Sequence, residues 1–129
     1  MLHFEIKDFN YRYKDDFYII SAKKEQHYLL SIQKMPEIKR YEQQLIYEEL
    51  VNENQRYTNF GETEALVKKL NEKLEKGNVI INCFNNYCEI KFDEIVLSEK
   101  DEFKIRLSNL SNGIHNITYV NKYFFDELE

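Results

Sequence analysis

The segment at residues 79–92 has the hydrophobic pattern of a β-hairpin with one buried face. If Asn85 and Asn86 occupy the central positions of a type I′ turn, where φ is positive, the two strands come into register. A shift of one residue would bury Glu89 and Lys91, so this register is strongly specified. The opposed pairs on the apolar face are Val79 with Phe92, Ile81 with Ile90, and Cys83 with Cys88.

The first third of the chain predicts a three-stranded antiparallel meander with turns at residues 14–16 and 24–25. The strand pairings set by the two turns place apolar residues on the same face of the meander. The alternation of apolar and polar residues changes phase near Lys7 and Asp8, where we expect a β-bulge or a break. The predicted cross-strand pairs are Tyr13 with Phe17, Tyr11 with Ile19, Ser21 with Tyr28, and Ile19 with Leu30.

Two helices are expected in the middle of the chain, where the hydrophobic period lengthens after Pro36. Proline suits the first helical position and Glu37 suits the positive end of the helix dipole, so the first helix is predicted over residues 37–53. The second follows a loop at residues 57–61 and ends at Gly77, a residue suited to a left-handed cap. Its buried face is expected to consist of Leu66, Val67, Leu70 and Leu74.

The last third predicts further strands at residues 95–97 and 103–107, then a loop at residues 111–113 leading to a strand at residues 114–119 and an aromatic anchor at residues 123–125. The predicted fold class is α+β, with a mainly antiparallel sheet of about six to eight strands in the order βββ-αα-ββββ(β). Two helices pack on one face of this sheet. The 129 residues are sufficient for a single domain, residues 1–129, with its own core.

The chain is acidic, with a net charge of −5, and residues 78–129 hold nine carboxylates against five basic side chains. Negative charge repels nucleic-acid phosphate and attracts basic protein surfaces, although solubility alone also explains such a surplus. Tyrosines and basic residues mix at residues 11–14 as in nucleic-acid platforms, but core packing explains the tyrosines better. The sequence shows no leader and no apolar run of membrane-spanning length, so we expect a cytoplasmic protein without membrane contact.

Side chains that carry chemistry are few. Cys83 and Cys88 lie close enough in the predicted hairpin to form a disulfide, but in a reducing compartment they are expected to remain thiols and pack as small hydrophobes. His3, His27 and His115 are too scattered for a zinc site, and no nucleophile motif or glycine-rich phosphate loop accompanies them. The sequence therefore predicts no catalytic, metal or cofactor site.

These observations favour a small non-enzymatic binding protein that occludes a protein partner with a basic surface, in the manner of a bacterial toxin-immunity or inhibitor protein. Direct nucleic-acid binding is not expected. Carboxylates gathered at strand ends can form charge-assisted pairs with the partner's Lys and Arg side chains. The predicted partner-binding residues are Asp93, Glu94, Glu99, Asp101, Glu102, Asp126, Glu127 and Glu129.

Two alternatives remain open from the sequence. One is a phage or mobile-element protein whose acidic surface mimics nucleic acid and blocks a DNA-binding enzyme. The other is a small enzyme or ligand-binding domain with a pocket between sheet and helices, in which His27 or His115 would act with nearby carboxylates.

Overall fold

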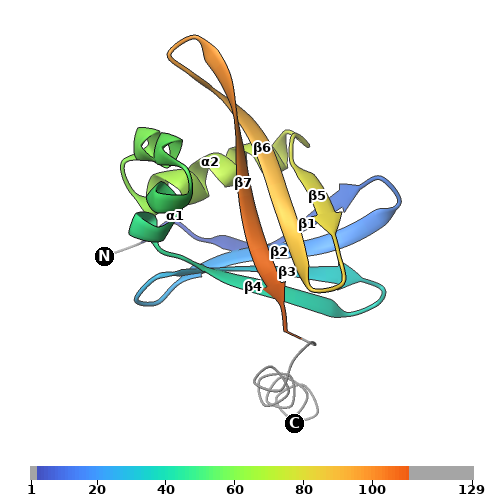
Figure 1. Ribbon diagram of the computed structural model, residues 1–129. Helices are drawn as coiled ribbons and strands as arrows, with labels where there is room; N and C mark the ends of the chain where they lie inside the picture. The colour runs from blue at the N-terminus through green and yellow to red at the C-terminus, as the bar shows by residue number, and fades with distance from the viewer. Residues whose placement is uncertain (1–2, 111–129) are drawn as a thin grey trace.

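A computed structural model describes residues 3–110 and contains one antiparallel sheet of seven strands in the order β1-β2-β3-β4-β7-β6-β5 (Figure 1). This arrangement confirms the predicted α+β class with a mainly antiparallel sheet. The strands are β1 (Ile6–Tyr13), β2 (Asp16–Lys24), β3 (Tyr28–Met35), β4 (Lys39–Leu45), β5 (Ile80–Cys83), β6 (Tyr87–Val96) and β7 (Glu99–Asn109). The helices are α1 (Tyr47–Glu53), the 3-10 helix η1 (Gln55–Phe60) and α2 (Thr63–Glu75).

The sheet is strongly curled, so that β5–β7 run steeply across the direction of β1–β4 (Figure 1). The two parts meet where β4 pairs with β7, and the helices lie together on one side of the curl. Apolar side chains from both parts and from α2 form one continuous core. Fully buried members of this core include Ile20, Leu30, Ile32, Val67, Leu70, Ile90, Phe103 and Leu107.

The predicted register of the β5–β6 hairpin is confirmed, because Ile81 pairs with Ile90 and Cys83 with Cys88. The predicted turn type is wrong, since neither asparagine of the turn has a positive φ. The carbonyls of Asn85 and Asn86 instead accept hydrogen bonds from Asn109, at 2.9 Å from its side-chain amide and 3.0 Å from its backbone N–H. Contact with β7 therefore shapes a turn that the local sequence alone assigned differently.

The meander is confirmed, but its register is one residue away from the prediction at the first turn. Lys14, with a φ of 56°, and Asp15 form a two-residue turn, so Tyr11 pairs with Tyr18 rather than with Ile19. The second turn is longer than predicted, with residues 25–27 between the paired Lys24 and Tyr28, and Ser21 lies opposite Ser31 instead of Tyr28. Apolar residues occupy both even and odd positions of β2, so alternation could not decide which face is buried.

The predicted irregularity near Lys7 and Asp8 is confirmed. The pairing of β1 with β2 shifts between Ile6 and Phe9, and Asp8 has a φ of 39°. This β-bulge allows Ile6 and Tyr11 to reach the same core although their positions differ in parity.

The helix predicted over residues 37–53 is largely wrong, because Lys39–Leu45 is strand β4 and α1 begins at Tyr47. Tyr41 and Leu45 are four residues apart, a spacing that suits one face of a helix and equally one face of a strand. Both are buried, and β4 has a strand neighbour on each side.

The second predicted helix is confirmed as α2, with its four expected apolar residues buried. Gly77 follows the helix with a φ of 72°, and the backbone N–H of Asn78 donates to the carbonyl of Lys73 at 2.9 Å. This is the geometry of a Schellman cap, which ends the helix where the glycine predicted.

The predicted strand at residues 103–107 is part of the longer strand β7, whereas of the strand predicted at residues 95–97 only Ile95 and Val96 belong to β6. Strands β6 and β7 are joined by a two-residue turn at Leu97 and Ser98, whose φ values of 51° and 69° are both positive. The loop at residues 111–113, the strand at residues 114–119 and the aromatic anchor at residues 123–125 lie outside the described residues.

None of the helices between residues 3 and 110 has the length and apolar character needed to cross a bilayer.

Candidate functional site

The β6–β7 hairpin extends beyond the strands that flank it, and its tip projects from the body of the protein (Figure 1). Within residues 3–110, β5 pairs with β6 no farther than Lys91, and β4 pairs with β7 no farther than Ser108. The pairing of β6 with β7 continues to Val96 and Glu99. The outer part of the hairpin is therefore a two-stranded ribbon.

Five of the predicted partner-binding carboxylates lie together on this ribbon. Asp93 pairs with Glu102, and Glu94 with Asp101, while Glu99 follows the turn. Since neighbouring residues of a strand face opposite sides, these carboxylates divide between the two faces of the ribbon. Asp126, Glu127 and Glu129 lie outside the described residues.

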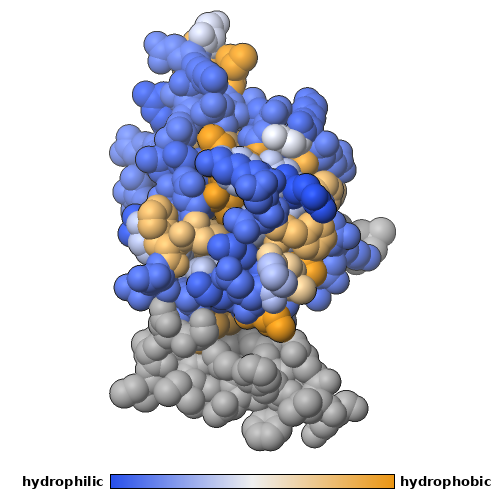
Figure 2. All heavy atoms as spheres, turned by 90° about the vertical axis from the view of Figure 1, so that its right-hand side faces the viewer, coloured by the Kyte–Doolittle hydropathy of each residue, from blue (hydrophilic) through white to orange (hydrophobic). Residues whose placement is uncertain are grey.

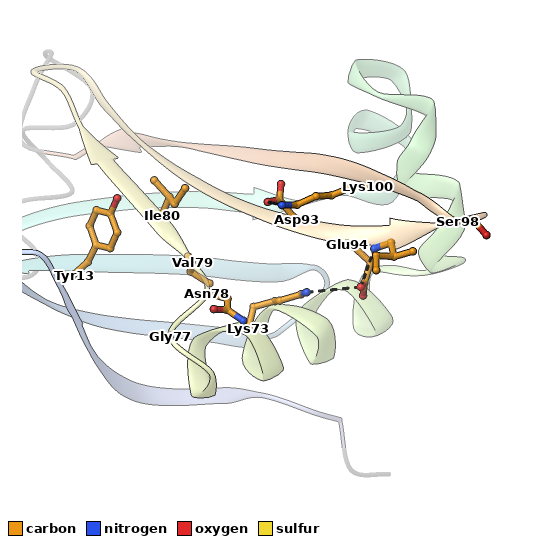
Figure 3. A pocket seen from close by; sticks show the side chains of 11 residues that line it. Tyr13, Lys73, Gly77, Asn78, Val79, Ile80, Asp93, Glu94, Ser98 and Lys100 are labelled. Atoms are coloured by element: carbon orange, nitrogen blue, oxygen red, sulfur yellow. Dashed lines mark hydrogen bonds and ion pairs between the residues drawn. The ribbon is translucent and has the colours of Figure 1, made fainter.

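The inward-facing carboxylates bind the helices. Glu94 lies 2.9 Å from Lys69 Nζ and 3.7 Å from Lys73 Nζ, both on α2, and the Lys73 contact is drawn in Figure 3. Burial opposes ionisation of Glu94, but the hydrogen bond from Lys69 and the neighbouring positive charges lower its pKa below the ordinary value. Glu94 is therefore a charged anchor between β6 and α2.

Asp101 is the corresponding anchor on β7. It is 8% exposed and pairs with the guanidinium of Arg56, which belongs to η1. Its second oxygen, Oδ2, is buried and has no hydrogen-bond partner among the described residues. Both strands of the ribbon are thus attached to the helical layer by an ion pair.

The outward-facing carboxylates are paired within the ribbon. Asp93 lies 3.3 Å from Lys100, and Glu102 lies 3.5 Å from Lys104. Glu99 is exposed beside the turn. The structure thus brings the five residues together, but four of them already have a basic neighbour, which reduces the negative charge offered to solvent.

The tip carries apolar side chains that sequence analysis did not select. Ile95 is 71% exposed and Leu97 is 93% exposed, and the upper end of the molecule in Figure 2, where the tip lies, shows hydrophobic atoms. The left-handed backbone conformation of Leu97 is sterically unfavourable, and exposing its apolar side chain to water also costs free energy. The sequence signal for the tip was the short apolar run at residues 95–97, which has charged residues on both sides.

A groove of about 740 Å³ runs beside the ribbon, between the edge of β6 and the end of α2 (Figure 3). The residues that line it include Tyr13, Lys73, Asn78, Ile80, Asp93 and Ile95. The groove exists because β5 does not continue alongside Asp93. The backbone N–H of Asn78, which would face β6 in a longer strand, is held by the carbonyl of Lys73.

The β6 edge in this groove has backbone groups without a strand neighbour. Phe84 N–H donates to the Tyr87 carbonyl, so alternate residues of β6 from Tyr87 onward point their backbone groups toward β5. Asp93 and Ile95 continue this series beyond the end of β5. The Ile95 N–H is bound by the Glu94 carboxylate at 3.1 Å.

The histidines do not form a comparable site in the described part of the chain. His3 Nδ1 lies 3.9 Å from Glu64, but that carboxylate already accepts the Phe4 N–H at 3.1 Å and the Tyr28 hydroxyl at 3.3 Å. His27 is exposed, and His115 lies outside the described residues. Residues 3–110 contain no group of three or more His, Cys, Asp and Glu side chains placed to hold a metal.

Comparison of the chain with protein-family models, curated proteins and solved structures gives no match.

Proposed function

We propose that this chain is a non-enzymatic binding protein that blocks a protein partner with the tip of its β6–β7 hairpin, in the manner of an inhibitor or toxin-immunity protein. The observation that carries the proposal is the exposure of Leu97 and Ile95 at the end of a projecting ribbon. Burying such side chains in a partner's pocket contributes roughly 25 cal/mol for each Å² of apolar surface removed from water.

The ribbon is held in place before binding. Glu94 attaches β6 to α2, and Asp101 attaches β7 to η1, so the tip projects from two fixed points. A binding element that is already ordered loses less conformational entropy on association than a mobile loop does. This favours a tip that enters a preformed cleft.

Charge near the tip indicates the chemistry of the partner. Residues 93–102 contain five carboxylates and one lysine, and after the ion pairs are counted Glu99, beside the turn, is the carboxylate with no ion-pair partner among the described residues. A cleft with an apolar floor and a rim of Lys and Arg side chains would complement both features. The carboxylates lie on both faces of the ribbon and surround an apolar tip, which supports a protein partner more than a continuous row that imitates phosphates.

The proposal is tested with two variants that differ in the position of the lost apolar group. Ile95→Ser with Leu97→Ser removes the tip, whereas Ile38→Ser removes an apolar side chain that is 64% exposed, also at positive φ, in another turn. Tagged wild-type and variant proteins are used to capture partners from a lysate of the source organism, and Kd is then measured for the purified partner.

We expect the tip variant to bind the partner more than about tenfold more weakly, because a few residues at the centre of an interface carry most of the binding energy. Ile38→Ser should bind as the wild type does. Equal binding by all three proteins would reject the tip as the contact, and a partner that is nucleic acid would reject the proposed class.

A further inference from the structure

Cys83 and Cys88 face each other across the β5–β6 hairpin, with their sulfur atoms 3.3 Å apart and no disulfide between them. The adjacent pair is hydrogen-bonded, because Phe84 N–H donates to the Tyr87 carbonyl at 2.8 Å. The cysteines therefore occupy a non-hydrogen-bonded position, where Cα atoms approach to about 4.5 Å. A disulfide spans about 4.4–6.8 Å between Cα atoms, so this pair is within bonding range.

The two thiols differ in access. Cys88 is fully buried, whereas Cys83 is half-buried and lines a surface cavity of about 250 Å³. Tyr18 and Lys34 line the same cavity. A small reagent that enters from solvent therefore meets Cys83 first.

The surroundings of the two sulfurs also differ. Hydrogen bonding from Cys88 lowers the pKa of the Cys83 thiol, and the hydroxyls of Tyr18 and Tyr41 and the charge of Lys34 act in the same direction against burial. The hydrogen bond to Cys83, together with burial, raises the pKa of Cys88. One sulfur is thus favoured as the thiolate and the other as the thiol.

The charge of Lys34 is shared with neighbouring carboxylates. Lys34 on β3 lies 4.0 Å from Asp16 on β2 and 3.8 Å from Glu37 in the β3–β4 turn. These carboxylates reduce but do not remove its positive effect at Cys83. Lys14 adds a second cation to the cavity lining, and burial raises the pKa of both Tyr18 and Tyr41, which keeps their hydroxyls protonated.

We propose that Cys83 and Cys88 form a hydroperoxide-reactive dithiol in which Cys83 attacks and Cys88 resolves. The Cys83 thiolate attacks the O–O bond of a hydroperoxide, so an S–O bond forms and the O–O bond breaks. The leaving hydroxide or alkoxide takes a proton from solvent. Cys83 is oxidised by two electrons to a sulfenic acid, and the peroxide is reduced to water or an alcohol.

Cys88 completes the reaction within the hairpin. Its sulfur attacks the Cys83 sulfenic acid, so an S–S bond forms, the S–O bond breaks, and the hydroxide leaves as water with the proton of the Cys88 thiol. The product is a cross-strand disulfide between β5 and β6. This chemistry does not depend on the β6–β7 tip or on a protein partner.

The test treats the reduced full-length protein with hydrogen peroxide and follows its intact mass and its free thiols. Wild type should lose two hydrogen atoms and both thiols without forming disulfides between molecules. Cys88→Ser should accumulate a sulfenic acid at Cys83 that dimedone traps, and Cys83→Ser should remain unmodified under the same conditions. Circular dichroism establishes that both variants are folded.

The rate of alkylation distinguishes a reactive Cys83 thiol from a pair of buried, unreactive cysteines. Iodoacetamide should label Cys83 roughly tenfold faster than Cys88, because thiolate content and access both favour it. Lys34→Gln should move the pH profile of Cys83 alkylation to higher pH, while Lys76→Gln, a change at an exposed lysine that does not line the cavity, should not. Faster labelling of Cys88, disulfides between molecules, or peroxide reactivity no greater than that of glutathione would overturn the proposal.

Discussion

The Tyr11 hydroxyl binds both backbone groups of Val79, donating to its carbonyl at 2.6 Å and accepting from its N–H at 2.9 Å. Tyr11 belongs to β1 and Val79 immediately precedes β5, which are at opposite ends of the strand order. The two edges of the curled sheet are therefore connected by a side chain in place of a ladder of backbone hydrogen bonds. Both residues are buried, so water cannot replace these bonds easily.

Tyr11→Phe should destabilise the protein by about 1–3 kcal/mol, because it leaves a buried N–H and a buried carbonyl without their partner. Urea unfolding followed by circular dichroism measures the change. Tyr13→Phe is the matched control, since Tyr13 is on the same strand and its hydroxyl has no hydrogen-bond partner among the described residues. Similar losses for both variants would show that the connection between the edges contributes little.

Removing the η1 anchor should weaken the base of the ribbon. Arg56→Ala should lower the stability of the protein, because it leaves the buried Asp101 carboxylate without its cation. Asp101→Asn in the same protein should recover part of the loss, because a neutral amide is less costly to bury than an unpaired charge. The four proteins of this double-mutant cycle are compared by urea unfolding, with Arg12→Ala as the exposed control. An additive cycle would contradict the pairing.

Acid should weaken the attachment of the N-terminal segment to α2. The Phe4 N–H is the main cause that lowers the pKa of Glu64 in the folded protein below its ordinary value of 4.5. A lowered folded-state pKa means that the stabilising contribution is present above the unfolded-state pKa and is lost as pH falls through the folded-state pKa. The stability difference between wild type and Glu64→Gln should therefore shrink between about pH 6 and about pH 3, as urea midpoints will show. A difference that grows on acidification would reverse the assigned sign.

Substitutions that make the turn at the tip more stable should weaken the binding that we propose for it. Leu97 and Ser98 both have positive φ, for which Asn and Gly are the favoured residues in a two-residue hairpin turn. Leu97→Asn with Ser98→Gly should raise stability by about 1 kcal/mol, because the steric cost of the left-handed conformation is relieved. The unfolding midpoint and the Kd for the captured partner are measured together. A less stable variant would contradict the conformational explanation, and unchanged Kd would contradict the function of Leu97.

A part of the fold could be predicted where its own sequence allows only one structure. The β5–β6 register was predictable because Glu89 and Lys91 exclude the alternative. Strand β4 was not, because the spacing of Tyr41 and Leu45 fits two periods and only pairing with β3 and β7 decides between them.

The site was predictable in location but not in its contacts. The run of carboxylates marked the β6–β7 hairpin, yet nothing local to it indicates that Asp101 meets Arg56, which is 45 residues away in sequence. The same holds for Glu94 and its two lysines on α2. The exposed tip was missed because short apolar runs normally indicate a buried strand, and exposure is decided by how far the neighbouring strands extend.

The Schellman cap of α2 has a consequence for behaviour at high concentration. The cap binds the Asn78 N–H to the Lys73 carbonyl, so the chain does not pair with β6 at Asp93. An unpaired strand edge of this kind favours edge-to-edge aggregation between identical molecules. The Glu94 carboxylate occupies the Ile95 N–H on that edge, and Asp93 and Lys100 place charges beside it. Charged side chains therefore protect this edge, which β5 does not cover. They discourage fibre growth and leave the tip accessible.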